Sequence, residues 1–181
     1  MKKTDAELVQ RAQRGDKDAL VELYECYNAS VFTYIYFRVD ELKTAEDLTA
    51  EVFVRMVTKI GSYVEKGRPI LSWLYTIARN LIIDYYRVKG SQIEMPLLET
   101  QVSDENAHPA AIAESELERA SLRRAMKYLT EDQRRVVLLK FIEGRENSEV
   151  AVILGKNERA IRSLQHRALV TLQRVMKLGG A

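Results

Sequence analysis

A stretch without hydrophobic periodicity divides this chain of 181 residues. Residues 88–112 contain Gly90, Pro96 and Pro109 and follow neither the helical nor the strand period. From residue 90 to residue 118 there is no Lys or Arg, and the acidic residues there are Glu94, Glu99, Asp104, Glu105, Glu114, Glu116 and Glu118. Such a polar, acidic composition buries too little apolar surface to fold alone, so we expect a flexible linker over residues 90–112.

The segments on either side of this linker have the composition and spacing of helices. Gly and Pro are scarce, and apolar residues recur every three or four positions. Capping residues predict helix starts at Thr4 or Asp5, and at Asp16, Thr44 and Thr130. We therefore predict an all-α protein with two helical domains, residues 1–89 and 113–181.

The segment from Ser72 to Arg87, SWLYTIARNLIIDYYR, is predicted to be one helix with a core side and polar sides. At about 100° per residue, the core side carries Leu74, Ile77, Ala78, Leu81 and Tyr85. A second side carries Trp73, Thr76, Asn80, Asp84 and Arg87, and a third carries Tyr75, Arg79 and Tyr86. Aromatic rings stack on unpaired bases and arginines hold phosphates, so the polar sides suit single-stranded nucleic acid. A lone Trp73 would more simply be a core aromatic, but Asn80 and Arg87 beside it favour the nucleic-acid interpretation.

Residues 146–175 have the pattern of a helix-turn-helix. A short helix, SEVAVIL, is followed by a turn at Gly155, and Asn157 can cap a longer second helix. The core side of that helix carries Ile161, Leu164, Ala168 and Leu172, and the opposite side carries Arg159, Arg162, Ser163, His166 and Arg167. Arginine can pair with guanine edges in a major groove, so this side suits duplex DNA. The simpler alternative is a solvated basic face on a structural helix.

The sequence lacks the residue sets that catalysis or metal binding requires. It has no paired Cys or His at zinc spacing, no glycine-rich phosphate loop and no nucleophile with a base. We therefore expect no enzymatic activity, no metal and no cofactor. No signal peptide precedes the first helix and no run approaches the ~20 apolar residues of a membrane span, so we expect a cytoplasmic protein without membrane insertion.

Five runs, taken together and in this order, resemble a known family. They are GDKDALVELYECY, AEDLTAEVFVR, SWLYTIARNLIIDYYR, LTEDQRRVVLLKFIEG, and EVAVILG with the basic helix after it. They are similar to the bacterial sigma-70 family of RNA polymerase sigma factors, in its small extracytoplasmic-function group. The resemblance covers nearly the whole chain outside the linker.

This resemblance implies a function and partners. Sigma domain 2, at the N-terminus, would bind the clamp helices of core RNA polymerase and would open and read the promoter −10 element. Sigma domain 4, at the C-terminus, would bind the −35 element and the polymerase flap. The partners would be core polymerase, promoter DNA and an anti-sigma factor, which in this family is often membrane-bound and could hold the chain at the inner membrane face.

The resemblance also implies roles for particular residues. The polymerase-binding helix would use Asp47, Glu51, Val52, Phe53 and Arg55, although their spacing alone indicates an ordinary solvated helix face. The −10 element would be read by the loop from Lys66 to Ile70, including Arg68, and by Trp73, Tyr75, Arg79, Asn80 and Arg87. The −35 element would be contacted by Asn157, Arg159, Arg162, Ser163, His166 and Arg167.

The chain departs from the family pattern at a few positions. Ala50 stands where the family has Gln, which puts one polar contact to polymerase in doubt. Arg145 and Glu146 replace an apolar and a small capping residue, so the first helix of the motif is expected to begin later, near Asn147. Arg159 begins a triplet that is often Gly-Thr-Val in the family, which should alter the −35 bases that are read.

Two alternatives from other functional classes stay open on the sequence. The first is a helix-turn-helix regulator that binds duplex DNA without polymerase, and it leaves the Asp47 helix without a role. The second is a helical protein-interaction adaptor with no DNA role. Loss of Arg162 and Arg167 would leave the activity of such an adaptor unchanged.

Overall fold

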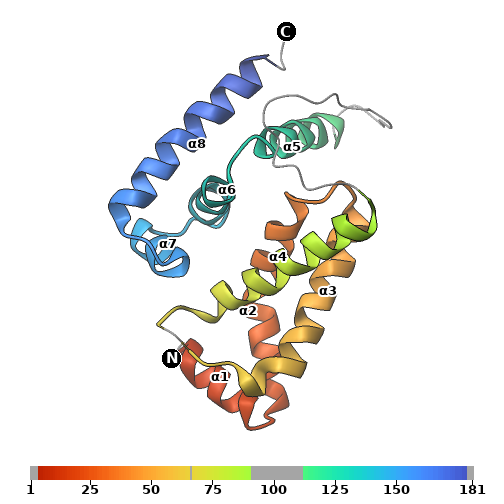
Figure 1. The fold of residues 1–181 in the computed structure, drawn as a ribbon, viewed down its shortest axis with the longest axis vertical. Helices are drawn as coiled ribbons and strands as arrows, with labels where there is room; N and C mark the ends of the chain where they lie inside the picture. Colours follow the sequence, from red (N-terminus) through yellow and green to blue (C-terminus); the bar gives the residue numbers. More distant parts are fainter. Residues whose placement is uncertain (1–3, 66, 91–111, 179–181) are drawn as a thin grey trace.

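The protein is described by a computed structural model that covers residues 4–65, 67–90 and 112–178, with the side chains of residues 112–117 and 178 not described. All regular secondary structure in these ranges is helical (Figure 1). The predicted all-α class is therefore confirmed. Most of the predicted linker, residues 91–111, lies outside the described residues.

The N-terminal group of helices packs around α2. Its elements are α1 (Asp5–Gln13), α2 (Lys17–Tyr36), α3 (Leu42–Lys59), the short 3₁₀ turn η1 (Ile60–Ser62) and α4 (Ile70–Val88). Helices α1, α3 and α4 all contact α2, and α3 also contacts α4. The core is formed by fully buried residues that include Leu23, Val31, Ile35, Val52, Met56, Leu74 and Ala78.

Local capping explains where two of these helices begin. Thr4 and Glu7 form a reciprocal capping box at the start of α1, with hydrogen bonds of 2.9 and 3.4 Å. The Asp16 carboxylate accepts from the backbone N–H groups of Asp18 and Ala19 at the start of α2. Both predicted starts are confirmed because a side-chain oxygen satisfies backbone donors that have no partner inside the helix.

The predicted start of α3 at Thr44 is wrong by two residues. The helix begins at Leu42, and its N-cap residue Glu41 forms no capping hydrogen bond with its side chain. The Thr44 hydroxyl instead donates to the Glu41 carboxylate at 3.4 Å. Helix α3 packs against both α2 and α4, and it begins without a side-chain cap.

The C-terminal group of helices packs around α8. Its elements are α5 (Ile112–Met126), α6 (Glu131–Val137), the π-helical turn η2 (Leu138–Ile142), α7 (Asn147–Leu154) and α8 (Glu158–Leu178). Helices α5, α6 and α7 each contact α8. The core here includes Met126, Val136, Leu138, Leu139, Val150, Ile161 and Ala168. Thr130 and Gln133 form the predicted capping box at the start of α6.

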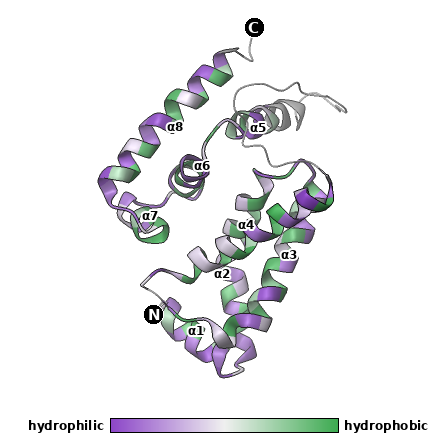
Figure 2. Cartoon of the chain, viewed as in Figure 1, coloured by the Kyte–Doolittle hydropathy of each residue, from purple (hydrophilic) through white to green (hydrophobic). Residues whose placement is uncertain are grey.

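The two groups of helices lie against each other (Figure 1). Helix α7 contacts α4, and side chains of α2 and α4 form hydrogen bonds with α6, α7 and the residue that follows η2. Along α8, hydrophilic residues alternate with apolar ones (Figure 2). The basic residues Arg159, Arg162 and Arg167 of this helix are exposed.

Candidate nucleic-acid and polymerase interfaces

Helix α8 is positioned by a sharp turn and a side-chain cap. Gly155 ends α7 in the left-handed conformation, with φ of 62°, which glycine adopts without steric cost. The Asn157 side chain accepts a 2.8 Å hydrogen bond from the Ala160 N–H group and so caps α8, as predicted. The first helix of the motif begins at Asn147, also as predicted.

One side of α8 is dry and the opposite side is basic. Ile161, Leu164, Ala168 and Leu172 are all buried. The side chains on the opposite side line one shallow hollow on the surface, and they are Arg159, Arg162, Ser163, His166 and Arg167. The structure thus brings together five of the six residues that were predicted to read duplex DNA, with Asn157 at the helix start beside them.

Hydrogen bonds to the α8 backbone and one ion pair hold some side chains of this basic face in place. The Ser163 hydroxyl donates to the Arg159 carbonyl, and the Arg167 guanidinium donates to the Ser163 carbonyl at 3.3 Å. Arg162 lies 3.6 Å from Glu158 in an exposed ion pair one turn apart. Exposed pairs of this kind contribute little stability, so Arg162 can exchange Glu158 for a phosphate or a guanine edge at small cost.

Gln165 is a positioning residue that the sequence did not indicate. Its amide donates a 2.6 Å hydrogen bond to the Asn147 side chain, which joins the start of α7 to the middle of α8. The small Ala151 is buried on α7, which contacts α8. No periodic signal distinguishes Gln165, because it lies between the core side and the basic side of α8.

The start of α4 carries the first of the residues assigned to the −10 element. Trp73 is half-buried, and its ring lies 4.7 Å from the Tyr63 ring with an angle of 38° between the two planes. The Tyr63 hydroxyl donates to the Arg68 carbonyl at 3.5 Å, so the aromatic pair supports the loop before α4. Arg68 is exposed in that loop, and Lys66 lies outside the described residues.

Tyr75 does not lie on a polar face, and that expectation is wrong. Only 2% of Tyr75 is exposed, and its ring stacks on Tyr34 with 4.5 Å between the centroids. Its hydroxyl donates to the Glu143 carboxylate at 3.1 Å. Burial and the neighbouring Glu143 charge raise the pKa of Tyr75 well above its ordinary value, so the phenol stays neutral. In this arrangement Tyr75 cannot reach a base.

The remaining residues assigned to this helix are accessible. Arg79, Asn80 and Arg87 are exposed on α4. Arg87 forms a 3.0 Å ion pair with Asp84, three residues earlier. Trp73, Asn80 and Arg87 follow one another at seven-residue intervals and so form a row along α4. The row joins a stacking surface to hydrogen-bond donors, which suits an unpaired strand.

Helix α3 has a polar side and a core side, and the residues assigned to polymerase binding divide between them. Asp47 is exposed, and Glu51 and Arg55 form a 2.9 Å ion pair one turn apart. Val52 is fully buried, and Phe53 is 6% exposed and lines the groove described next. A matched motif transfers residue identity but not exposure, and a direct contact of these two side chains with polymerase stays a prediction.

An apolar groove of about 670 Å³ runs between α2 and α3. Its lining includes Leu20, Tyr24, Phe32, Phe53, Val54 and Val57. Tyr24, Val54 and Val57 are 45%, 56% and 49% exposed, which is unusual for large apolar side chains on neighbouring helices. The sequence analysis did not identify Tyr24, Val54 or Val57 as parts of an interface. The signal that could have indicated it is that Val54 and Val57 are apolar residues of α3 outside its core side.

Neither a metal cluster nor a membrane span is found in the described ranges. No three His, Cys, Asp or Glu side chains gather there as a metal site would require. Among the helices that the structure describes, none combines the length and the apolar character that crossing a membrane requires.

Comparison with known families and proteins matches both groups of helices. The family described as sigma-70 region 2 matches residues 23–92, and that described as sigma-70, region 4, matches residues 119–172. The ECF RNA polymerase sigma factor BldN of Streptomyces coelicolor is 41% identical over 173 residues, which cover 94% of this chain and 65% of BldN. The chain therefore spans about two thirds of the length of that relative.

A second curated relative gives the same family, and a solved structure gives the same fold. The ECF RNA polymerase sigma factor SigD of Mycobacterium tuberculosis is 30% identical over 173 residues, which cover 92% of this chain and 81% of SigD. The sigma factor RpoE, solved in complex with the anti-sigma factor NepR from Bartonella quintana, is 24% identical, with a TM-score of 0.59 over 86% of this chain and 95% of RpoE. On these sequence matches, the chain belongs to the ECF RNA polymerase sigma factors of the sigma-70 family.

Proposed function

We propose that this chain is a promoter-specificity subunit that binds core RNA polymerase and directs transcription initiation by recognising a −10 and a −35 element. Sigma factors have no catalytic activity of their own, so the chemistry of RNA synthesis belongs to the polymerase. The observation that carries the proposal is the basic face of α8, where Arg159, Arg162, Ser163, His166 and Arg167 line one exposed surface.

Each of the two DNA-reading surfaces suits a different form of DNA. The basic face of α8 fits the major groove of a duplex −35 element, where arginines pair with guanine and hold phosphates. The row Trp73, Asn80 and Arg87 on α4 fits the unpaired strand of the −10 element, together with Arg79 and the loop that contains Lys66 and Arg68. Unpairing bases costs a few kcal/mol, which stacking on an aromatic ring offsets.

The polymerase-binding surface is the outer side of α3 with the groove beside it. Asp47, Glu51 and Arg55 supply charge, while Val54 and Val57 supply exposed apolar surface. An exposed apolar patch rimmed by charges is typical of a protein interface. Docking on polymerase would hold both DNA-reading domains on one promoter. Once one domain has bound its element, the other would be held near its own element at a raised effective concentration.

The domain boundaries, location and further partner follow from the same proposal. We assign residues 1–89 to sigma domain 2, 90–112 to the linker and 113–181 to sigma domain 4, supported by the matches over 23–92 and 119–172. We place the protein in the cytoplasm, where core polymerase and DNA are found. RpoE was solved bound to an anti-sigma factor, and we propose that a protein of that class also binds this chain.

The test is transcription in vitro with purified core polymerase. We expect transcripts that start at native promoters only when this chain is added. No such transcript on any native target would overturn the proposal. A gel shift with and without core enzyme separates it from a stand-alone regulator, which would bind duplex DNA equally well in both cases.

A pair of variants tests the polymerase-binding surface. The V54E/V57E variant should weaken core binding by at least about tenfold, because docking would bury two new charges in an apolar contact. Val88→Glu is the matched control, since Val88 is exposed on α4 and away from the groove. Equal core affinity for V54E/V57E and the control would remove the groove from the proposed interface.

A further inference from the structure

Gln13, the last residue of α1, joins that helix to the chain that leaves α3. Its side-chain amide donates a 3.0 Å hydrogen bond to the Ile60 carbonyl and a 2.7 Å hydrogen bond to the Tyr63 carbonyl. A carboxamide nitrogen carries two hydrogens, so one Gln13 side chain can form both bonds at once. Helix α1 also contacts η1, the short turn that begins at Ile60 (Figure 1). The two bonds therefore fix the end of α3 relative to α1.

The two carbonyl groups lie where the hydrogen bonding of the α3 helix ends. The last carbonyl groups of a helix find no donor inside the helix and need one from elsewhere. The Tyr63 N–H group donates to the Ile60 carbonyl at 3.0 Å, and the chain then continues in an extended conformation, with φ of −68° and ψ of 130° at Tyr63. Gln13 supplies a further donor at this point. It thus caps the end of α3 from a different helix.

The end of α1 that carries Gln13 is itself held in place. The Arg11 guanidinium donates to the Asp16 carboxylate at 2.7 Å and to the Glu22 carboxylate of α2 at 3.0 Å. Ala12, directly before Gln13, is buried in the core that α1 shares with α2. Gln13 therefore holds the two carbonyl groups from a fixed position.

Tyr63 connects this cap to the surface that we assign to the −10 element. Its ring lies 4.7 Å from the Trp73 ring, and its hydroxyl donates to the Arg68 carbonyl at 3.5 Å. Tyr63 and Trp73 are both half-buried, so part of each ring stays accessible. A shift of the Tyr63 backbone would carry its ring away from Trp73 and its hydroxyl away from the Arg68 carbonyl.

A Trp73 ring that is fixed before DNA arrives stacks at lower cost. Binding must otherwise order a mobile side chain, which loses rotational freedom. A ring already held against Tyr63 has lost that freedom in the free protein, so more of the stacking energy remains for keeping the bases apart.

We propose that Gln13 is a positioning residue for the −10 surface. Its amide fixes the Tyr63 backbone, and the Tyr63 ring in turn fixes the Trp73 ring that stacks on an unpaired base. This inference rests on the proposed function, because it assumes that Trp73 contacts unpaired DNA.

The test uses the full chain with Gln13→Glu, which keeps the size of the side chain and replaces the donor with an acceptor. An ionised carboxylate cannot donate to a carbonyl, so both bonds are lost. In the free chain, the fluorescence of Trp73, the only Trp in the sequence, should shift to longer wavelength and be quenched more strongly by acrylamide. With core polymerase, permanganate reactivity should show promoter opening reduced about fivefold, as expected for the loss of modest hydrogen bonds. Affinities for core polymerase and for duplex −35 DNA should not change.

Gln13→Lys is the rescue variant, because an ammonium group carries three donors and can bind both carbonyl groups. It should restore the fluorescence of Trp73 and most of the promoter opening. Gln10→Glu and Gln10→Lys are the matched controls, since Gln10 is exposed one turn earlier on α1 and the two variants make the same changes of charge. Both controls should behave as wild type.

Promoter opening by Q13E that equals opening by Q10E would overturn the inference, and so would equal losses in Q13E and Q13K. A loss of core affinity in Q13E that accompanies the loss of opening would mean that Gln13 stabilises the whole domain, which also overturns it. Failure of the proposed function has a different signature, because wild type itself would then give no promoter-dependent transcript.

Discussion

Helices α4 and α8 both present side chains suited to DNA, but they differ in charge and in how much of each helix is covered. The face of α8 has three arginines and one serine–histidine pair, with a single acid, Glu158, beside it. The row on α4 has one aromatic ring, and its Arg87 is already paired with Asp84. Helix α8 is thus built for phosphates and base edges of a duplex, and α4 for stacking on separated bases.

Coverage differs as well. Helix α8 packs on one side only, so its opposite side is fully available. Helix α4 packs against α2 and α3 and also contacts α7. Tyr75 is buried against Tyr34 and Glu143, and Ser72 donates to the Ile153 carbonyl of α7. The two helices therefore differ in that α8 has its whole basic face free, whereas only Arg79, Asn80 and Arg87 of the residues assigned on α4 are fully exposed.

The largest expected effect comes from the basic face of α8. The R162A/R167A variant should lose about 100-fold in affinity for duplex promoter DNA, because each base-reading arginine contributes roughly 1–3 kcal/mol. Gel shifts with the polymerase complex would measure this. Arg174→Ala is the matched control, since Arg174 is exposed further along α8 and outside the basic face. Equal losses in R174A and R162A/R167A would mean that charge alone, without a defined face, binds the DNA.

A smaller, selective effect is expected on α4. Trp73→Ala should reduce open-complex formation about tenfold, since stacking contributes roughly 1–3 kcal/mol per base. Binding of duplex −35 DNA should not change. Trp73→Phe keeps a ring on Tyr63 and should retain most of the activity, which separates stacking from loss of packing. Permanganate reactivity of unpaired thymines measures the opening, and unchanged reactivity in W73A would count against this role.

Salt dependence should distinguish the two helices further. Arg167→Ala should lower the slope of log affinity against log salt by about 1, as expected for one lost phosphate contact. Trp73→Ala should leave the slope unchanged, because stacking releases no counterions. Titrations of the polymerase complex with potassium chloride would measure both slopes. A change of slope in W73A alone would reverse the assignment of the two helices.

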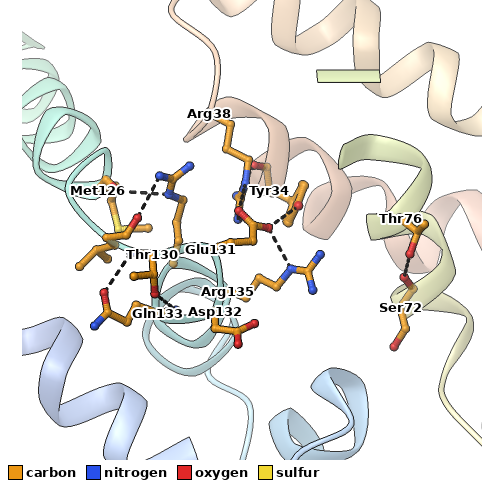
Figure 3. A network of polar contacts seen from close by, with 12 residues as sticks. Tyr34, Arg38, Ser72, Thr76, Met126, Thr130, Glu131, Asp132, Gln133 and Arg135 are labelled. Atoms are coloured by element: carbon orange, nitrogen blue, oxygen red, sulfur yellow. Dashed lines mark hydrogen bonds and ion pairs between the residues drawn. The ribbon is translucent and has the colours of Figure 1, made fainter. Parts of the chain in front are cut away.

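The smallest effect concerns the pH dependence of the contact that Glu131 of α6 forms with Tyr34 and Arg38, on the side of the molecule that includes α4 but not the basic face of α8 (Figure 3). Burial alone would raise the pKa of Glu131, but the charges of Arg38 and Arg135 and the Tyr34 hydroxyl lower it to about 2, from an ordinary value of 4.5. A lowered pKa means that the contact is fully stabilising above pH 4.5 and is lost as the pH falls from there towards about 2. The nearby Arg134 stays charged throughout this range.

We therefore expect the radius of gyration to stay constant between about pH 6 and 8 and to increase only in acid. Scattering measured across this range checks the expectation, and E131Q should lack the acid-induced part that comes from this group. A radius that changes between pH 6 and 8 in wild type would show that another group controls the domain contact.

The sequence predicted the helices well where capping or a one-sided apolar pattern decided them. Thr4, Asp16, Thr130 and Asn157 cap their helices as expected, because capping is a local interaction. The basic face of α8 was predicted in full for the same reason, since only one side of that helix is covered.

The errors arose where tertiary contacts decide. Tyr75 lies about a third of a turn from the polar row of α4, and only the approach of Glu143 and Tyr34 determines that it is buried. Val52 and Phe53 follow Glu51 in a motif associated with polymerase binding, and that motif did not predict how far each is buried. Val54 and Val57 lie outside the core side of α3, so helical periodicity predicts neither burial nor a function for them. The groove could not be predicted from α3 alone, because residues of α2 form its other wall.

The exposed side chains of α4 also bear on where free copies of this protein settle in a cell. Replication forks and repair gaps expose single strands across a whole chromosome. Arg79, Asn80 and Arg87 are open to such strands, so under the proposed function those strands compete with promoters for every copy that is not bound to polymerase.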